Sequence, residues 1–381
     1  MALAAVSTFD ILDRTCYFQA QKQVQIRFLH VGDPELMRFA FIQHTWSEHP
    51  GAMYLSGVLR HHGHETTCFI PSAESSFQNV LKEWKPDVVG FSLTSGEMAW
   101  ARKFIKEVKQ TLGIPIILGG PHPTFFPESI EEEGVDYLCV GAGEDVLLEF
   151  VQAQEAGRTP ENILGLCVKR GKEIICTPPR PLARNLDLYP LPDRALYKRY
   201  PSLHRNPHKH VIAGRGCPFD CNYCHNHLLF KIYGRNCYCL PSQERVFQEI
   251  ELIQAVGKIE LLDFADDTFT AKKTWLMPFL EEYASRIKLP FICNIHAKCV
   301  SPEIAQALAK AGCWRVCIGV ESGSERIRKT ILGKNISDEE LIRAAQLMHQ
   351  NGILILTNNM MGIPTETIDD AWKTVAINTK M

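Results

Sequence analysis

The sequence lacks the features that would place it in a membrane, on nucleic acid or outside the cell. It has no run of about 18 apolar residues, the length that a membrane-spanning helix requires. It has no long basic block, and 41 Lys and Arg are balanced by 43 Asp and Glu, so phosphate neutralisation on nucleic acid is not expected. The N-terminal segment MALAAVSTFDILDR has no early positive charge and no long apolar core. We therefore expect a cytoplasmic protein without an export signal.

Repeats and low-complexity tracts are also lacking, and the composition is that of a globular protein. The 381 residues suit two or three domains, with 45% hydrophobic and 22% charged residues. The sequence does contain 14 cysteines. In a protein that is not exported, we expect them to be reduced thiols, used in the core or as metal ligands.

The first part of the chain alternates apolar segments with helical patterns. Near-continuous apolar segments between helices predict a parallel, doubly wound, Rossmann-like α/β sheet covered on both faces. The predicted strands are 25–32, 65–70, 87–95, 114–120 and 135–141, and the helical patterns are 52–63, 97–113 and 127–134.

The middle of the chain has a different character. Residues 165–176 predict a hairpin around Arg170-Gly171-Lys172. Residues 177–207 are rich in proline, which fixes extended backbone and blocks helices. We interpret this segment as an ordered linker.

The βα alternation resumes near residue 209. Helix start signals stand at Ser301-Pro302 and at the capping box Ser337 to Glu340. The pattern predicts an open or partial (β/α) barrel of the TIM type, with its chemistry at the C-terminal ends of the strands. A complete eight-unit barrel needs about 250 residues, so we expect a partial barrel that ends early. The predicted strands are 210–214, 259–266, 291–296, 315–320 and 353–358.

These patterns divide the chain into four parts. The predicted parts are an N-terminal extension (1–24), the Rossmann-like domain (25–158), the hairpin and linker (159–207) and the partial barrel (208–381).

A cysteine-rich segment, GRGCPFDCNYCHN, follows the first strand of the predicted barrel. Cys217, Cys221 and Cys224 have the spacing C-x3-C-x2-C. Thiolates suit iron–sulfur clusters, whose usual complement is four cysteines. Three cysteines would leave one iron of a 4Fe–4S cluster open to a non-protein ligand, as a catalytic zinc keeps an open position.

Three other interpretations of this segment stay open. Cys221 to His225 matches the c-type haem pattern C-x-x-C-H, although that requires export and gives Cys217 no function. A zinc ion could use the three cysteines with His225 or His227. The thiols could also be unliganded, although a polar loop is a poor place to bury them.

The segment GRGCPFDCNYC resembles the cluster loop of radical S-adenosylmethionine (SAM) enzymes. FADDTFT (264–270), GVESGSERIRK (319–329) and MGIPTET (361–367) are similar to further motifs of that superfamily and follow successive predicted strands. GGPHPTFFPE (119–128) and GAGEDVLLEF (141–150) resemble its cobalamin-binding subgroup. This subgroup includes cobalamin-dependent methyltransferases and the anaerobic oxidative cyclase of bacteriochlorophyll synthesis.

The resemblance implies three cofactors: a 4Fe–4S cluster, SAM and cobalamin. In the family, the open iron chelates the amino and carboxylate groups of SAM. One electron then cleaves a carbon–sulfur bond and yields the 5′-deoxyadenosyl radical. It implies an external one-electron donor of the flavodoxin or ferredoxin type and a small-molecule substrate.

The resemblance also assigns SAM-binding residues. Tyr223 matches an aromatic near the adenine, and Glu321 matches a residue that contacts SAM. The other matching positions are Asp266 and Asp267 near the amino group, Ser322, Gly323 and Ser324 as close-approaching backbone, and Met360 and Gly362 beside the adenine, where the family's first glycine is Asn358 here. Structural alternatives stay open: Tyr223 as core filler, Glu321 as a helix N-terminal carboxylate, and Asp266 and Asp267 as caps.

The cobalamin site is expected at the carboxyl ends of the first domain's strands. The residues are Ser92, Thr94, Ser95, Gly119, Gly120, Pro121, His122, Gly141, Gly143 and Glu144. A turn without a ligand is the alternative for Gly119-Gly120. The sequence lacks D-x-H-x-x-G, the motif that supplies a histidine to cobalt, and we interpret His30 as a core or rim histidine. We expect cobalamin bound without its own base and without a protein histidine.

Two departures from the family are visible. The family's sixth barrel strand has no counterpart, and Cys237 and Cys239 stand where relatives often have basic residues. We interpret these two as ordinary thiols, with cluster ligation as the alternative.

The resulting hypothesis is a radical enzyme that methylates an unactivated carbon. The first alternative uses the same cofactors for oxidation, cyclisation or rearrangement. The second is a non-catalytic protein that binds cobalamin or a cluster, or a gene fragment.

Overall fold

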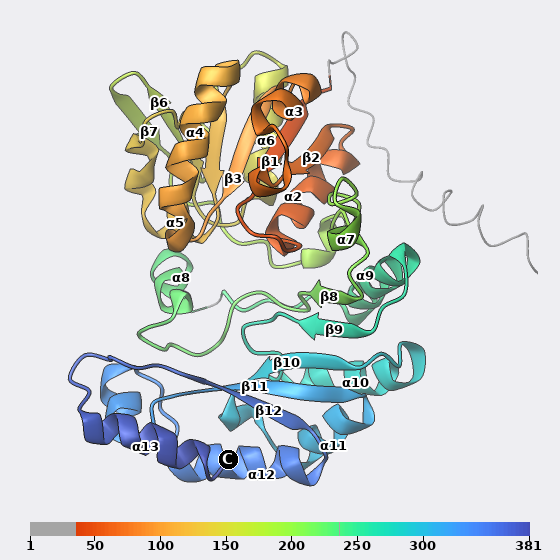
Figure 1. The fold of residues 1–381 in the computed structure, drawn as a ribbon, viewed down its shortest axis with the longest axis vertical. Helices are drawn as coiled ribbons and strands as arrows, with labels where there is room; N and C mark the ends of the chain where they lie inside the picture. The colour runs from red at the N-terminus through yellow and green to blue at the C-terminus, as the bar shows by residue number, and fades with distance from the viewer. Residues whose placement is uncertain (1–35, 236) are drawn as a thin grey trace, which may run out of the picture. The chain divides into compact units, whose positions relative to one another are not determined.

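The computed structural model describes residues 36–235 and 237–381, and Figure 1 shows their fold. The predicted strand at 25–32 and His30 lie outside the described residues.

The first sheet has seven strands in the order β2-β1-β3-β4-β5-β6-β7. The first five pair in parallel, as predicted, whereas β6 and β7 pair antiparallel. Their bounds are β1 Arg38–Ile42, β2 Glu65–Phe69, β3 Val88–Ser92, β4 Ile116–Gly119, β5 Tyr137–Cys139, β6 Leu166–Arg170 and β7 Glu173–Cys176.

Two parts of this sheet differ from the sequence-based expectation. No strand was predicted at β1. In the structure, β1 lies inside the sheet, between β2 and β3. The hairpin β6–β7 forms as predicted, but β6 pairs with β5. The hairpin therefore extends the first sheet beyond the predicted boundary at residue 158 instead of belonging to the linker.

Helices cover both faces of this sheet. One core joins α2 (Pro50–His61) and α6 (Glu144–Glu155) to Phe39 and Phe41 of β1. A second core joins α3 (Phe77–Trp84) and α4 (Met98–Leu112) to the opposite face of the same strand. The helical pattern at 127–134 is instead a short 3₁₀ turn, η3 (Pro127–Glu131), which follows the short helix α5 (Pro121–Phe125). Pro127 lacks the N–H that would continue α5.

The second sheet has five parallel strands in the order β12-β11-β10-β9-β8. The five strands match the predicted partial barrel, and their helices pack into one continuous core. Ser301 caps α11, and Ser337 and Glu340 form the predicted capping box of α12. The bounds are β8 His208–Val211, β9 Leu261–Phe264, β10 Phe291–Ile295, β11 Cys313–Glu321 and β12 Leu354–Asn359, with α9 Gln243–Val256, α10 Lys273–Arg286, α11 Pro302–Lys310, α12 Asp338–Gln350 and α13 Ile368–Asn378.

The proline-rich segment 177–207 is ordered, as predicted, and it packs on the first domain. Tyr197 is fully buried, and its hydroxyl donates to Gln43 Oε1 at 2.6 Å. Asp193 accepts from the Ser56 hydroxyl at 2.7 Å, and its backbone N–H donates to Met53 O at 2.9 Å. The segment contains only the short helices η4 (Leu186–Leu188) and α7 (Pro201–His204).

The expectation that the cysteines are reduced is wrong for one pair. Cys167 and Cys176 stand opposite each other in the antiparallel register of β6 and β7 and form a disulfide. This cross-strand pairing was not visible in the sequence because it depends on the hairpin register. In residues 36–235 and 237–381, no helix is long and apolar enough to cross a bilayer.

The linker contact can be tested at Gly57 in α2. A Cβ at this position would collide with the carbonyl oxygen of Leu191 and lie 3.3 Å from Asp193 N. We expect Gly57→Ala to lower the free energy of unfolding by about 1–3 kcal/mol, although alanine by itself favours a helix by about 1 kcal/mol. Urea denaturation measures the difference.

Gly51→Ala is the matched control on the same helix. A Cβ there would meet only the His49 side chain, at 3.4 Å. This variant should be as stable as the wild type or slightly more stable. A Gly57→Ala protein as stable as the control would contradict the packing of the linker on α2.

Candidate functional site

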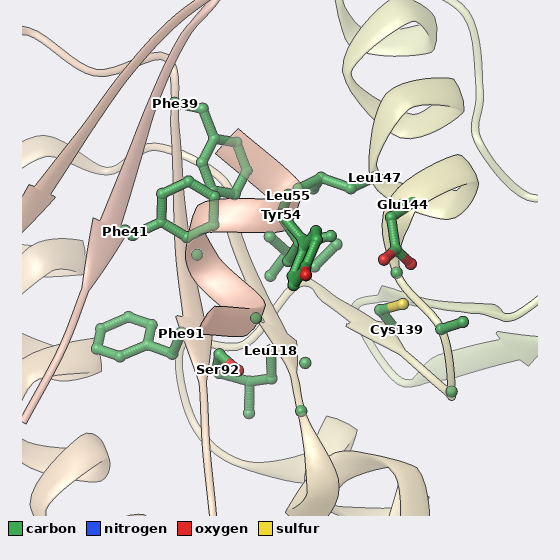
Figure 2. Close-up of a pocket in the computed structure, with 18 of the residues that line it drawn as sticks. Phe39, Phe41, Tyr54, Leu55, Phe91, Ser92, Leu118, Cys139, Glu144 and Leu147 are labelled. Carbon is green, nitrogen blue, oxygen red and sulfur yellow. The ribbon is translucent and has the colours of Figure 1, made fainter. Parts of the chain in front are cut away.

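A cavity opens at the carboxyl ends of the strands in the first sheet. It encloses about 290 Å³, and Figure 2 shows part of its lining. Of the predicted cobalamin residues, the lining includes Ser92, Gly119, Gly120, Gly141, Gly143 and Glu144. The other four, Thr94, Ser95, Pro121 and His122, are not among its lining residues. Ser95 Oγ and His122 Nδ1 instead lie 3.0 Å apart and are exposed.

Most of the cavity wall consists of side chains that the sequence analysis did not assign to a site. The aromatic rings of β1 and the aliphatic side chains of α2 and α6 lie on this wall in Figure 2. They are Phe39, Phe41, Leu55 and Leu147. Phe91 and Leu118 also line the cavity, but their side chains belong to the core on the opposite face of the sheet, where the Phe91 ring contacts Trp100. Periodicity alone cannot distinguish a strand residue that faces a cavity from one that faces the core.

The cavity chemistry fits a flat apolar group with a polar tail. The aromatic wall suits a heterocyclic base, and the polar atoms of Ser92, Glu144 and Arg215 suit a sugar-phosphate. Gly120 has φ of +91°, and a Cβ there would lie 2.7 Å from Leu93 N, so this rim position requires glycine. These features fit the nucleotide tail of cobalamin.

The cysteine loop, residues 217–224, lies between β8 and α8 (His225–Tyr233). Its start is fixed by backbone contacts. Arg215 N donates to Cys239 O at 2.8 Å, and Cys239 N donates to Arg215 O at 3.0 Å. Gly216 has φ of +74°, and a Cβ there would lie 2.7 Å from Cys237 O. The thiol of Cys239 donates to Arg184 O at 3.1 Å. Cys239 therefore holds the start of the loop through its backbone, whereas its thiol points to the linker.

The three thiols differ in their surroundings. Burial raises the pKa of Cys217 and raises that of Cys221 to about 11. Burial also opposes ionisation of Cys224, but hydrogen bonds involving His225 and Asn226 outweigh it and lower the pKa of that thiol. Neighbouring thiols interact electrostatically, as expected for one donor set.

The alternative zinc site requires four ligands around one ion. Among the described residues, no three His, Cys, Asp or Glu side chains converge on a single-ion position. His227 Nδ1 lies 2.6 Å from Asp220 Oδ1. A 4Fe–4S cluster takes one thiolate on each of several irons, and Cys217, Cys221 and Cys224 are free thiols that share one loop.

The segment 266–268 supports the cysteine loop from β9. Asp266 Oδ2 accepts from Ala213 N at 3.0 Å, and burial raises the pKa of Asp266 to about 8. Asp267 Oδ2 accepts from Asn226 Nδ2 at 3.1 Å, and the same amide donates to Cys224 Sγ at 3.6 Å. Thr268 Oγ1 lies 3.3 Å from Cys217 Sγ. Asp267 therefore lies beside the loop, and Asp266 anchors the backbone before it at Ala213.

Glu321, Tyr223 and Lys334 form a polar triad at the end of β11, in which Glu321 and Lys334 are buried and Tyr223 is exposed. The Tyr223 hydroxyl donates to Glu321 Oε1 at 2.9 Å, and Lys334 Nζ donates to the same oxygen at 3.0 Å. Glu321 has φ of +65°, and such backbone strain in a non-glycine residue is typical of functional sites. The structure thus brings together Tyr223 and Glu321, both predicted to contact SAM. Lys334 was missed because nothing in its local sequence indicates the contact.

The remaining predicted SAM residues lie near this triad but have other contacts. Gly323 N donates to Thr374 Oγ1 at 2.7 Å, and a Cβ at Gly323 would collide with the backbone of Lys373. Ser322 and Ser324 are buried beside it, so the close backbone approach here is to α13. Met360 N donates to Glu321 O at 2.8 Å, and Gly362 is exposed with φ of +75°.

The triad can be tested by removing one charge. The side chains of Lys334 and Glu321 are only 8% and 11% exposed. We expect Lys334→Met to lower the free energy of unfolding by about 3–5 kcal/mol, because it leaves a buried carboxylate without its cation. Adding Glu321→Gln to this variant should restore part of the loss. Urea denaturation of the metal-free protein measures both.

Lys329→Met provides the surface control. Lys329 and Glu325 form an i,i+4 pair with 38% and 36% of their side chains exposed, and its loss should cost at most about 1 kcal/mol. Equal effects of Lys334→Met and Lys329→Met would show that the buried pair does not hold Glu321.

Comparison with known proteins matches both halves of the chain. Residues 47–151 match the B12 binding domain, and residues 211–376 match the Radical SAM superfamily. An uncharacterized methyltransferase of Pyrococcus horikoshii is 30% identical over 341 residues, which cover 87% of this chain and 73% of that protein. The anaerobic magnesium-protoporphyrin IX monomethyl ester cyclase of Rubrivivax gelatinosus is 25% identical, over 83% of this chain and 59% of the cyclase.

A solved structure shares the fold of both halves. TsrM from Kitasatospora setae, a radical SAM methyltransferase with tryptophan and a SAM analogue bound, superposes with a TM-score of 0.75 at 19% identity. The match covers 90% of this chain and 71% of TsrM. Another structure of TsrM has cobalamin and a [4Fe-4S] cluster bound. From the two domain matches and the Pyrococcus relative, the chain belongs to the radical SAM superfamily, in the subgroup that carries a B12-binding domain.

Proposed function

We propose that this protein is a cobalamin-dependent radical SAM enzyme that methylates an unactivated carbon of a small-molecule substrate. The observation that carries the proposal is the three-cysteine loop, whose Tyr223 is hydrogen-bonded to the buried Glu321–Lys334 pair. The cavity in the first domain supports it with room for a nucleotide tail. Bound together, the three cofactors would supply reductive cleavage of SAM to a 5′-deoxyadenosyl radical and a methyl group for transfer.

The residues of this chain would bind and orient those groups. Cys217, Cys221 and Cys224 would hold the cluster and leave one iron for SAM. Glu321 can accept hydrogen bonds from an amine or from ribose hydroxyls, and Lys334 keeps its charge balanced. The ring of Tyr223, which is 38% exposed, offers an apolar face for the adenine, while its hydroxyl fixes the ring on Glu321.

The same proposal includes an external electron donor and a location. The cluster needs one electron per turnover, so we propose a flavodoxin- or ferredoxin-type donor. A reducing cytoplasm suits such donors and the free thiols of the cysteine loop, whereas the Cys167–Cys176 disulfide is unusual for that compartment.

A second candidate function is oxidation or cyclisation with the same cofactors. It is favoured by the similarity to the Rubrivivax cyclase. Methylation is preferred because the Pyrococcus methyltransferase is more similar and a larger share of its length is matched.

The iron site is tested by Cys221→Ala. We expect this variant to lose most of its iron after anaerobic reconstitution, because a cluster then has two thiolates from the loop. Cys317→Ala in β11 is the matched control, since its half-buried thiol lies outside the loop, and it should keep its iron. Iron and sulfide analysis gives the readout, and full iron content in Cys221→Ala would refute the ligand assignment.

The activity is tested by the products formed from SAM. The reduced, reconstituted protein should convert SAM to 5′-deoxyadenosine, and mass spectrometry should also detect S-adenosylhomocysteine if SAM is the methyl source for cobalamin. 5′-Deoxyadenosine alone, with substrate present, would favour cyclisation or oxidation. Loaded protein that forms neither product would support a non-catalytic binding protein.

A further inference from the structure

The segment 141–144, between β5 and α6, lies between the cavity and the cysteine loop. Its four residues, Gly141, Ala142, Gly143 and Glu144, all line the cavity. Both flanks of the cysteine loop also contact this segment. The segment is therefore the place where the two candidate cofactor sites share residues.

The first contact comes from the flank before the loop. Arg215, two residues before Cys217, places Nη2 at 2.5 Å from Glu144 Oε1. Its guanidinium carbon lies 5.2 Å from the centroid of the Tyr54 ring, a cation–π contact. Arg215, Glu144 and Tyr54 all line the cavity. Burial opposes the charge of Arg215, but the Glu144 carboxylate outweighs it and raises the pKa of Arg215.

The second contact comes from the flank after the loop. Helix α8 begins at His225, directly after Cys224, and ends at Tyr233. The Tyr233 hydroxyl occupies the position that a Cβ on Gly141 would need, and Gly141 has φ of +90°. Asn226 is the only fully buried residue of α8, so the helix has few deep contacts, and Gly141 is one of the positions on which it rests.

The Arg215 flank has little freedom to move independently of the loop. Its backbone is paired with Cys239 on both sides. The segment 237–240 also packs closely on both glycines of this flank. A Cβ at Gly214 would collide with the Leu240 side chain, and a Cβ at Gly216 would collide with Cys237 O. A shift of Glu144 would therefore move the backbone that leads into Cys217.

We infer that segment 141–144 couples the cavity to the cysteine loop, so that a ligand in the cavity changes the environment of the cluster. This inference rests on the proposed function, in which the cavity takes the cobalamin tail and the loop takes a 4Fe–4S cluster. Arg215 is a positioning residue in it and touches no reacting atom. Coupling of this kind is reciprocal. If bound cobalamin changes the affinity for the cluster by some factor, the bound cluster changes the affinity for cobalamin by the same factor.

The test measures the dissociation constant of hydroxocobalamin by absorbance titration, with cluster-free and with cluster-loaded protein. In the wild type, we expect the two constants to differ by roughly fivefold or more, the usual size of such coupling. We also expect the electron paramagnetic resonance spectrum of the reduced cluster to change when hydroxocobalamin is added. Both readouts are independent of turnover.

Arg215→Met should bring the two dissociation constants within about twofold of each other and abolish the spectral change. Because Arg215 also lines the cavity, both constants should rise in this variant, and the ratio between them is the readout. Glu144→Gln removes the same ion pair with less change of shape and serves if Arg215→Met fails to fold. The double variant should lose no more coupling than either single variant, because both remove one contact. Arg102→Met is the control, since Arg102 pairs with Glu132 on the surface of the same domain, and it should keep the wild-type coupling.

Gly141→Ala tests the second contact. The added methyl group must displace the Tyr233 hydroxyl, so we expect this variant also to lose coupling. Undiminished coupling in both Arg215→Met and Gly141→Ala would overturn the inference, as would a wild type that binds both cofactors without coupling. A wild type that binds neither a cluster nor hydroxocobalamin would overturn the proposed function instead, and with it the premise of the inference.

Discussion

The geometry of the candidate site depends on how the backbone before Cys217 is held. The two hydrogen bonds between Arg215 and Cys239 fix this backbone, and the glycines at 214 and 216 allow the segment 237–240 to approach closely. Asp266 adds a hydrogen bond to Ala213 from the neighbouring strand. Three thiols on an eight-residue loop would otherwise adopt many arrangements. A loop fixed at its start can present them to one cluster without a large entropic cost on binding.

The same constraint connects chemistry that lies on two separate sheets. Parallel strands carry their ligands at their carboxyl ends. The cavity lies at that edge of the first sheet, and the cysteine loop and Glu321 lie at that edge of the second. Arg215 and Tyr233, which flank the loop, both contact the segment that follows β5. An enzyme that must combine a methyl donor in one domain with a radical generated in the other needs such fixed contacts.

Much of the fold could be predicted from the sequence because buried parallel strands appear as short, continuous apolar segments. Nine of the ten predicted α/β strands correspond to observed ones, and the exception, 25–32, lies outside the described residues. The strand at Arg38–Ile42 was missed because the apolar segment 25–32 precedes it by only a few residues. Only one strand was predicted in this region, and it was assigned to 25–32. Strand order and the attachment of the hairpin to β5 are long-range properties that no local pattern records.

The site was predictable to the extent that its residues lie close together in sequence. The spacing of Cys217, Cys221 and Cys224 identified the loop, and family resemblance pointed to Tyr223 and Glu321. The sequence did not reveal the roles of Lys334, Asn226 and Tyr233. Each contacts a motif residue that is distant in sequence, namely Glu321, Asp267 and Gly141 respectively. Arg215 lies between two glycines beside the first cysteine, which is a local signal for a tightly held backbone, but its partner Glu144 becomes apparent only in three dimensions.

The central claim is that one chain binds both a cluster and a corrinoid. The most direct test is the anaerobic ultraviolet–visible spectrum of the purified protein after reconstitution with iron, sulfide and hydroxocobalamin and removal of unbound cofactor. The account predicts the broad absorption of a 4Fe–4S cluster together with corrinoid bands, at about one of each per chain. A protein that retains the cluster but no corrinoid, or a corrinoid but no cluster, would contradict it.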